Sequence, residues 1–236
     1  MPSSFSPEFE ILPLPQQKLW PDLEGLAALG FVLYGGTAIA LRLGHRVSVD
    51  FDFFSKEALN REAILKAFPR LNNATTLQDV ENSWSLLVPV GDTDQDTVKV
   101  SFFGGIAFGR VGTPEFTEDN VLLVASLDDL MATKLKVLFQ RSEAKDYRDI
   151  AAMLQDGADL AYGLAAGQLL FGNNFQPSVC LKALVFFEDG DLESLSNEER
   201  EILVSAVNEV SQLPEVQLLS EELLAPLEAD VAFEPS

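Results

Sequence analysis

Short apolar runs alternate with helix-like spacing in the first part of the chain, and this pattern predicts a mixture of strands and helices. Prolines at positions 2, 7 and 13 disfavour helix, so residues 1–14 are expected to be extended. Leucines at helical spacing predict a helix over Gln16–Leu29 that stops at Gly30. Further helices are predicted at Gly36–Leu43 and Asn60–Phe68, and short strands at Phe31–Tyr34 and Val49–Phe54.

Strand-like runs continue beyond residue 70, and from Ser126 onward the spacing becomes helical. Strands are predicted at Ala74–Gln78, Ser83–Val90, Thr97–Phe103 and Asn120–Val124. Ser126 and Asp129 form a candidate capping box. Helices are predicted at Leu127–Gln140, Lys145–Leu154, Asp159–Leu170, Pro177–Phe187, Asn197–Val210 and Ser220–Leu227. The pattern therefore predicts a mixed sheet with helices over residues 1–125, followed by a helical region over residues 126–236.

The composition is that of a globular chain without a membrane span. Of the 236 residues, 47% are hydrophobic, which is enough to form a core, yet no run of eighteen apolar residues occurs. Met1–Pro15 lacks the basic start and the long apolar stretch of a signal peptide. The single Cys180 and the single His45 exclude an internal disulfide and a Cys/His zinc cluster, and one thiol fits a cytoplasmic protein.

The formal net charge of −21 argues against broad, nonspecific binding to nucleic acid, because such binding needs a basic surface. The acidity is concentrated at one end, since the chain after Lys182 has fourteen acidic residues and one base, Arg200. A solvated acidic surface is the plainest interpretation of this end, and a surface for a basic partner is the alternative.

Two aspartates in an otherwise apolar strand provide the first candidate chemistry. Side chains alternate along a strand, so Asp50 and Asp52 project from one face while Phe51 and Phe53 project from the other. Two adjacent carboxylates repel each other unless a cation lies between them. Lysine or arginine can take that position, but Mg²⁺ suits it better, because it binds carboxylates together with substrate phosphate oxygens. Such pairs also occur on ordinary surface strands.

A glycine pair precedes this strand. Gly35 and Gly36 follow a buried strand and open a helix, where free N–H groups and the helix dipole favour phosphate. The Thr37 hydroxyl can add a donor, and the alternative is a tight turn in which Thr37 is only the N-cap. Thirteen residues separate Gly36 from Asp50, which lets the second strand return beside the first. The two motifs together predict a site for a nucleoside triphosphate (NTP) and its magnesium ions.

The combined motif resembles a known family. A glycine pair, a short spacer and Asp-x-Asp form the signature of the DNA polymerase β-like nucleotidyltransferase superfamily. The stretch GGTAIALRLGHRVSVDFDFF looks more narrowly like the AbiEii toxin family, the nucleotidyltransferases of type IV toxin–antitoxin and abortive-infection systems. A later stretch, VASLDDLMATKLKVLFQRSEAKDYRDIAAML, is similar to a second region of that family, so the resemblance covers Phe31–Leu154. It implies an α+β fold with a nucleotidyltransferase-like mixed β-sheet flanked by helices, and a helical C-terminal region.

The second region places a lysine on an apolar helix face. The neighbours of Lys134 three and four positions away are Leu130, Met131, Val137 and Leu138. A lysine in such a position either extends its ammonium group to solvent or meets an anion. The resemblance favours an anion, either a triphosphate or the strand carboxylates, because this lysine matches a motif position of the family.

Two aspartates follow in the segment KDYRDI. Asp146 and Asp149 lie three positions apart on one face of a predicted helix, and Lys145 can pair with Asp149. A salt-bridged surface helix explains this pattern without any catalytic role. The resemblance implies instead that one of these aspartates, Asp149 before Asp146, joins the active site and accepts a proton from the attacking hydroxyl. His45, which follows the helix-ending Gly44, is expected to cap helix carbonyls.

The resemblance implies a toxin-like enzyme that transfers a nucleoside monophosphate from an NTP to an acceptor hydroxyl, with RNA or tRNA as the candidate acceptor and a cognate antitoxin as a partner. In this hypothesis Mg²⁺ is held by Asp50 and Asp52, and the phosphates are bound by Gly35, Gly36, Thr37 and Lys134. A basic patch to guide an RNA end is predicted from Lys134, Lys136, Arg141, Lys145 and Arg148. Arg42 and Arg46 are candidates for phosphate contact or for pairing with nearby acids.

One departure from the superfamily pattern keeps a second interpretation open. The later strand Val98–Phe103 offers Lys99 and Ser101 on one face and lacks the third carboxylate that many members of the superfamily have there. The alternative is therefore a catalytically degenerate module of the same fold that binds a nucleotide or a protein.

Overall fold

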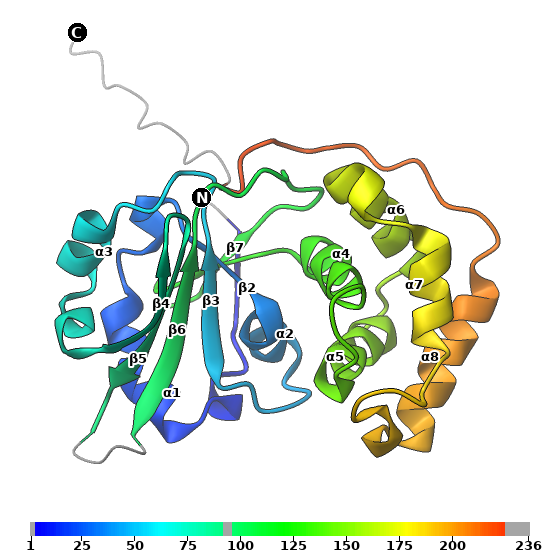
Figure 1. Cartoon of the computed structure of the whole chain (residues 1–236), viewed down its shortest axis with the longest axis horizontal. Coiled ribbons are helices and arrows are strands. Elements are labelled where there is room, and N and C mark those ends of the chain that lie inside the picture. Colours follow the sequence, from blue (N-terminus) through cyan, green and yellow to red (C-terminus); the bar gives the residue numbers. More distant parts are fainter. Residues whose placement is uncertain (1–2, 92–95, 225–236) are drawn as a thin grey trace, which may run out of the picture.

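The computed structural model describes residues 3–91 and 96–224, and a mixed eight-stranded sheet forms the centre of its N-terminal half (Figure 1). The strand order is β1-β7-β8-β2-β3-β6-β5-β4. The strands are β1 (Ser4–Phe5), β2 (Val32–Tyr34), β3 (Asp50–Phe54), β4 (Thr75–Val80), β5 (Ser83–Pro89), β6 (Thr97–Phe103), β7 (Glu115–Thr117) and β8 (Leu123–Val124). In the middle of the sheet, β3 pairs antiparallel with β2 and parallel with β6.

Helices cover both faces of the sheet. Figure 1 shows α1 (Leu14–Leu19) and α3 (Arg61–Ala67) on one face and α2 (Gly35–Leu43) on the other. The C-terminal helices lie beyond α2, and α4 and α5 pack directly against it. These helices are α4 (Leu127–Val137), α5 (Ala144–Gln155), α6 (Leu160–Phe171), α7 (Pro177–Leu184) and α8 (Asn197–Glu209). The α+β class and the mixed sheet predicted from the sequence are confirmed.

Alternation along β3 separates the core from the site. Phe51 and Phe53 are at most 1% exposed and stack with ring centroids 6.2 Å apart. Phe102 of β6 extends this stack, with its centroid 5.6 Å from that of Phe53. Asp50 and Asp52 point to the opposite face, as the period of two requires. The phenylalanines of this strand therefore fix it in the hydrophobic core, while the two aspartates remain available to a ligand.

The structure differs from the sequence-based prediction in four places: residues 1–14 contain a 3-10 turn at Phe9–Ile11, β7 was not predicted, and two predicted helices are shortened or absent. The helix expected over Gln16–Leu29 ends at Leu19, and two 3-10 turns follow, because Pro21 has no N–H to donate and Gly25 adopts a φ of 93°. The helix expected over Ser220–Leu227 is absent from its described part, where Ser220 pairs instead with Arg110; residues 225–227 lie outside the described residues.

After α8 the chain returns along the molecule to the sheet half, as Figure 1 shows. The returning segment, residues 210–224, is fixed by Arg110, whose backbone N–H donates to Ser220 O at 2.8 Å and whose Nε donates to Glu222 O at 3.1 Å. Lys56 adds an ion pair of 2.8 Å with Glu222. This return segment therefore joins the helical half to the sheet half.

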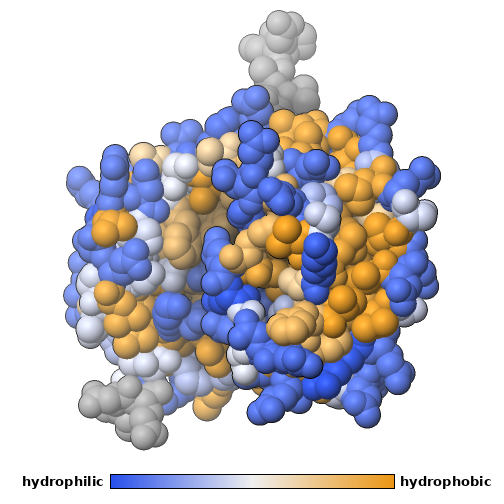
Figure 2. Space-filling view, turned by 45° about the vertical axis from the view of Figure 1, so that its right-hand side comes forward, coloured by the Kyte–Doolittle hydropathy of each residue, from blue (hydrophilic) through white to orange (hydrophobic). Residues whose placement is uncertain are grey.

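The surface of the C-terminal helices combines acidic and apolar side chains. Glu198, Glu201 and Glu209 of α8 are exposed, so this helix has an acidic surface, which fits both a solvated surface and a surface for a basic partner. Figure 2 shows hydrophobic side chains over the same half of the molecule, where Val179 is 43% and Phe186 54% exposed. No helix in the described part of the chain has the length and apolar character needed to cross a membrane.

Candidate active site

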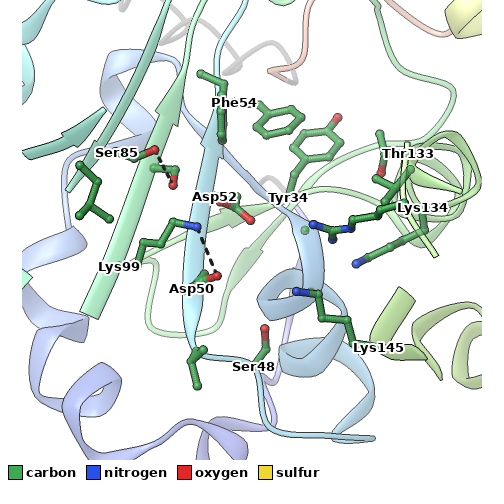
Figure 3. Close-up of a pocket in the computed structure, with 18 of the residues that line it drawn as sticks. Tyr34, Ser48, Asp50, Asp52, Phe54, Ser85, Lys99, Thr133, Lys134 and Lys145 are labelled. Atoms are coloured by element: carbon green, nitrogen blue, oxygen red, sulfur yellow. Dashed lines mark hydrogen bonds and ion pairs between the residues drawn. The ribbon is translucent and has the colours of Figure 1, made fainter. Parts of the chain in front are cut away.

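A pocket of about 540 Å³ lies between the exposed face of the sheet and the helices α4 and α5, beside the start of α2 (Figure 3). Its volume is in the range typical of small-molecule sites. Asp50 and Asp52 form part of the pocket wall, together with Gly35, Gly36 and Lys134. The structure therefore brings together the strand carboxylates, the glycine pair and the lysine that the sequence singled out.

The glycine turn is in contact with the carboxylates. Tyr34 pairs with Asp52 across β2 and β3, so the turn that follows Tyr34 begins beside that carboxylate. Gly35 has a φ of 76°, and a Cβ added to it would lie 2.7 Å from Oδ2 of Asp52. Both the backbone conformation and the close approach therefore require glycine at position 35. Gly35 and Gly36, the first two residues of α2, line the pocket that contains the carboxylates.

The two strand carboxylates fit a divalent cation. Burial raises the pKa of the Asp52 carboxyl, and the charge of Asp50 raises it further, while Lys99, Lys134 and a hydrogen bond from Ser101 offset these effects only in part. Lys99 of β6 approaches Asp50 with a distance of 3.5 Å between Nζ and Oδ2. Among the described residues, no group of three or more metal-binding side chains gathers anywhere. Two carboxylates suit Mg²⁺, which takes its other ligands from phosphate and water.

Thr37 does not have the role expected of its hydroxyl. The side chain is 1% exposed and donates to the backbone carbonyl of Asp50, and its Oγ1 lies 3.0 Å from Ser48 Oγ. Tyr34, rather than Thr37, is the N-cap of α2. The Thr37 side chain therefore fixes the start of α2 to the start of β3, and only the glycines remain as the phosphate-binding part of this turn.

Lys134 meets anions, but they come from its own chain. Its Nζ lies 2.7 Å from Asp146 Oδ1 and 2.7 Å from Asp149 Oδ2, and both of these side chains are fully buried on α5. Lys134 itself is 6% exposed. The apolar face of α4 thus places Lys134 at the pocket wall, where its ammonium group forms ion pairs with two buried carboxylates.

Asp149 binds two further side chains from the loop before β3. Arg46 donates to both of its oxygens, at 2.7 and 2.8 Å, and His45 Nε2 lies 2.7 Å from Oδ1. Burial alone would raise the pKa of Asp149, but the His45 hydrogen bond and the charges of Lys134 and Arg46 outweigh it and hold the pKa well below its usual range. A buried carboxylate with such a low pKa is a poor proton acceptor. Asp149 also lies outside the pocket lining, so its geometry does not favour the proton-accepting role predicted from the sequence.

The structure also gives His45 and Lys145 different partners from those that the sequence predicted. His45 contacts Asp149 rather than helix carbonyls. Lys145 pairs with Glu143 at 2.7 Å and not with Asp149. Asp146, like Asp149, is a buried carboxylate paired with basic side chains, and Arg141 Nε lies 2.8 Å from its Oδ2. Burial alone would raise the pKa of Asp146, but Arg141 and Lys134 outweigh this effect and lower it. The two buried aspartates of α5 therefore hold Lys134, Arg46 and Arg141 in place through ion pairs.

Although the chain as a whole is acidic, basic side chains outnumber acidic ones in the lining of the pocket. Five basic side chains line it against two acidic ones, and the basic set is Arg46, Lys99, Lys134, Arg141 and Lys145. Arg46 lies over the glycine turn, because a Cβ on Gly36 would be 2.6 Å from Nη2 of Arg46. The remaining members of the predicted basic patch point elsewhere: Lys136 bonds to Asn174 O, and Arg148 pairs with Glu199. Arg42 also lies outside the pocket lining and pairs with Glu115.

Sequence reasoning did not select the aromatic side chains at one end of the pocket. Phe54 and Phe103 line it beside the polar residues, and Figure 3 shows Phe54 near Tyr34 at this end. The sequence could have indicated Phe54, because it lies two positions after Asp52 and therefore on the same face of the strand.

The mixed sheet, the glycine turn and the adjacent carboxylates are the features of a nucleotidyltransferase. The family model described as nucleotidyl transferase AbiEii toxin, type IV toxin–antitoxin system, matches residues 23–219. The chain belongs to this family.

Two individual proteins are similar to the chain. An uncharacterized protein of Aquifex aeolicus, aq_aa25, is 29% identical over 200 residues, which cover 79% of this chain and 93% of that protein. Among solved structures, the nucleotidyltransferase toxin MenT4 from Mycobacterium tuberculosis is 15% identical with a TM-score of 0.49, covering 81% of this chain and 87% of the other.

Proposed function

We propose that this chain transfers a nucleoside monophosphate from an NTP to an acceptor hydroxyl at an RNA end. The acceptor oxygen bonds to the α-phosphorus while the bond to the pyrophosphate leaving group breaks, and the hydroxyl proton is released to solvent. The observation that carries the proposal is the contact between the Gly35 turn and the Asp52 carboxylate. This contact supports the proposal, because a helix start, which suits phosphate, and a pair of carboxylates then lie close enough to bind one triphosphate.

Each side of the pocket has its own part in this proposal. Asp50 and Asp52 hold Mg²⁺, which, when bound, neutralises phosphate charge and orients the reacting phosphate. The N–H groups at Gly35 and Gly36 bind the terminal phosphates, with the dipole of α2 behind them. The sheet half, residues 1–125, is in this proposal the nucleotidyltransferase core.

The helical region, residues 126–236, completes the site. Lys134 and Arg141 face the phosphates from α4 and the turn after it, and Arg46 approaches over Gly36. Asp146 and Asp149 hold these three cations in place before the substrate arrives, so little reorganisation is needed on binding. Lys145, which is exposed at the pocket rim, provides a contact for the RNA backbone. The antitoxin that a type IV system implies is the expected protein partner.

Incubation with labelled NTP, Mg²⁺ and total RNA tests the proposal. Label is expected to enter RNA with the native chain and to be lost with Asp52→Asn, because one carboxylate of the pair is then neutral. Asp156→Asn is the control, since Asp156 is exposed at the end of α5 and lies outside the pocket. No transfer to RNA, or equal transfer by Asp52→Asn, contradicts the proposal.

A binding module without turnover is the second candidate. Lys99 and Ser101 on β6 pair with Asp50 and Asp52, so the strand beside the carboxylates supplies no third acid. Tight binding of NTP by the native chain, without transfer of label to any RNA, favours this candidate.

A further inference from the structure

We infer that Phe54 and Phe103 form a stacking platform for a nucleobase, at the end of the pocket beyond Asp52. The inference rests on the proposed function, because that function fixes where phosphates lie. Phe54 follows Asp52 by two residues on the same face of β3, and Phe103 is its partner across β6. Two residues of strand span roughly 7 Å. A base joined through a ribose to a phosphate held at Asp52 therefore reaches the two rings.

The exposure of the rings distinguishes them from the core. Phe51, Phe53 and Phe102 point to the opposite face of the sheet and are at most 1% exposed. Phe54 and Phe103 are only partly buried, and both line the pocket. Part of each ring therefore faces the space beside the carboxylates.

The rings are held in a defined arrangement. Tyr34 stacks on Phe54 with a centroid distance of 4.8 Å and an interplanar angle of 14°, while Phe103 meets Phe54 edge to face at 5.2 Å and 75°. A phenyl ring fixed in this way loses little side-chain entropy when a flat ligand packs on it. Phenylalanine has no hydrogen-bonding group, so the platform recognises the aromatic plane of a base rather than its edge.

Calorimetric titration in the presence of Mg²⁺ tests this inference with three probes: ATP, inorganic triphosphate and a short oligoadenylate. Phe54→Leu and Phe103→Leu are expected to weaken binding of ATP by roughly 5- to 50-fold. Binding of triphosphate, which has no base, is expected to stay within a factor of two. Weaker ATP binding assigns the platform to the base of the NTP. Unchanged ATP binding with weaker oligoadenylate binding assigns it to the base of the acceptor.

Two variants separate stacking from packing. Phe108→Leu is the matched control, since Phe108 packs edge-on against Phe54 with centroids 6.3 Å apart but does not line the pocket. Phe103→Tyr retains an aromatic plane and is expected to bind ATP as the native chain does. If Phe108→Leu weakens ATP binding as much as Phe54→Leu, or if triphosphate and ATP weaken equally, the platform is refuted.

The two proposals fail in different ways. If the native chain binds ATP and triphosphate but the Phe54 and Phe103 variants bind all three probes normally, only the stacking platform is refuted. If the native chain binds neither ATP nor triphosphate, the proposed function is refuted and the platform with it.

Discussion

Replacement of Asp149 by asparagine tests the buried network that supports the pocket. Asp149 is fully buried and contacts three side chains, Lys134, Arg46 and His45, at 2.7 to 2.8 Å. Asparagine preserves the shape of this side chain but removes its charge and places an N–H₂ group against cationic donors. Lys134 would keep Asp146 as its partner, whereas Arg46 would lose both of its bonds to a carboxylate.

The expected loss of stability is large. Removing one partner of a buried ion pair typically costs about 3–5 kcal/mol, because the remaining charge stays buried without compensation. For a chain of this size, that corresponds to a decrease in Tm of roughly 6–20 °C. Asp79→Asn is the control, since its pair with Arg61 is solvent-exposed and is expected to contribute less than about 1 kcal/mol.

The effect also has a defined dependence on pH. The pKa of Asp149 is lowered in the folded state, so its stabilising contribution is fully present above the usual pKa of 3.8 and is lost as pH falls toward the folded-state value. The difference in unfolding free energy between the native chain and Asp149→Asn, measured by urea unfolding, should therefore be fully present at about pH 5. Below about pH 4 the difference should shrink, by at most about 1.4 kcal/mol per pH unit. A variant that melts within 2 °C of the native chain, or a difference that grows with acidification, would refute the network.

Three further predictions concern single positions. Gly35→Ala is expected to reduce NTP binding at least tenfold, because the added Cβ would displace the Asp52 carboxylate. Gly157→Ala is the control for backbone strain alone, since Gly157 has a φ of 101° and open space around it. This control variant should bind NTP as the native chain does. Lys134→Met is expected to lower both Tm and NTP affinity, since it leaves two buried carboxylates with one fewer cation, whereas Lys136→Met should change neither by much. Burial raises the pKa of the Cys180 thiol to about 12, so thiol reagents at pH 8 should modify it only after unfolding in guanidinium, and stoichiometric labelling of the folded chain would contradict its burial.

Local patterns explain which parts of the structure could be predicted. The period of two in Val49–Phe54 places both acids on one face, and the glycine stops at Gly30 and Gly44, both with positive φ, mark the ends of elements as expected. The failure over Gln16–Leu29 is also local, because Pro21 and Gly25 were present in the sequence and outweighed the leucine spacing.

The partners of charged side chains could not be predicted in the same way. His45 and Arg46 lie 104 and 103 positions from Asp149, and nothing in either segment indicates the other. Their pairing depends on how α5 packs against α2, which is a property of the assembled fold. Sequence reasoning therefore predicted that Asp149 lies near the site but could not predict its buried ion pairs, which set the pKa of the carboxylate.

The return segment has a consequence for how this chain folds during its synthesis. Arg110 and Lys56 belong to the sheet half, yet their partners, Ser220 and Glu222, follow the C-terminal helix α8 in the chain. A nascent chain folds from its N-terminus, so the sheet can form on the ribosome while the helical half is still unattached at its far end. The closing contacts become available only after the whole helical half, α4 to α8, has been synthesised, so the two halves are tied together late in folding.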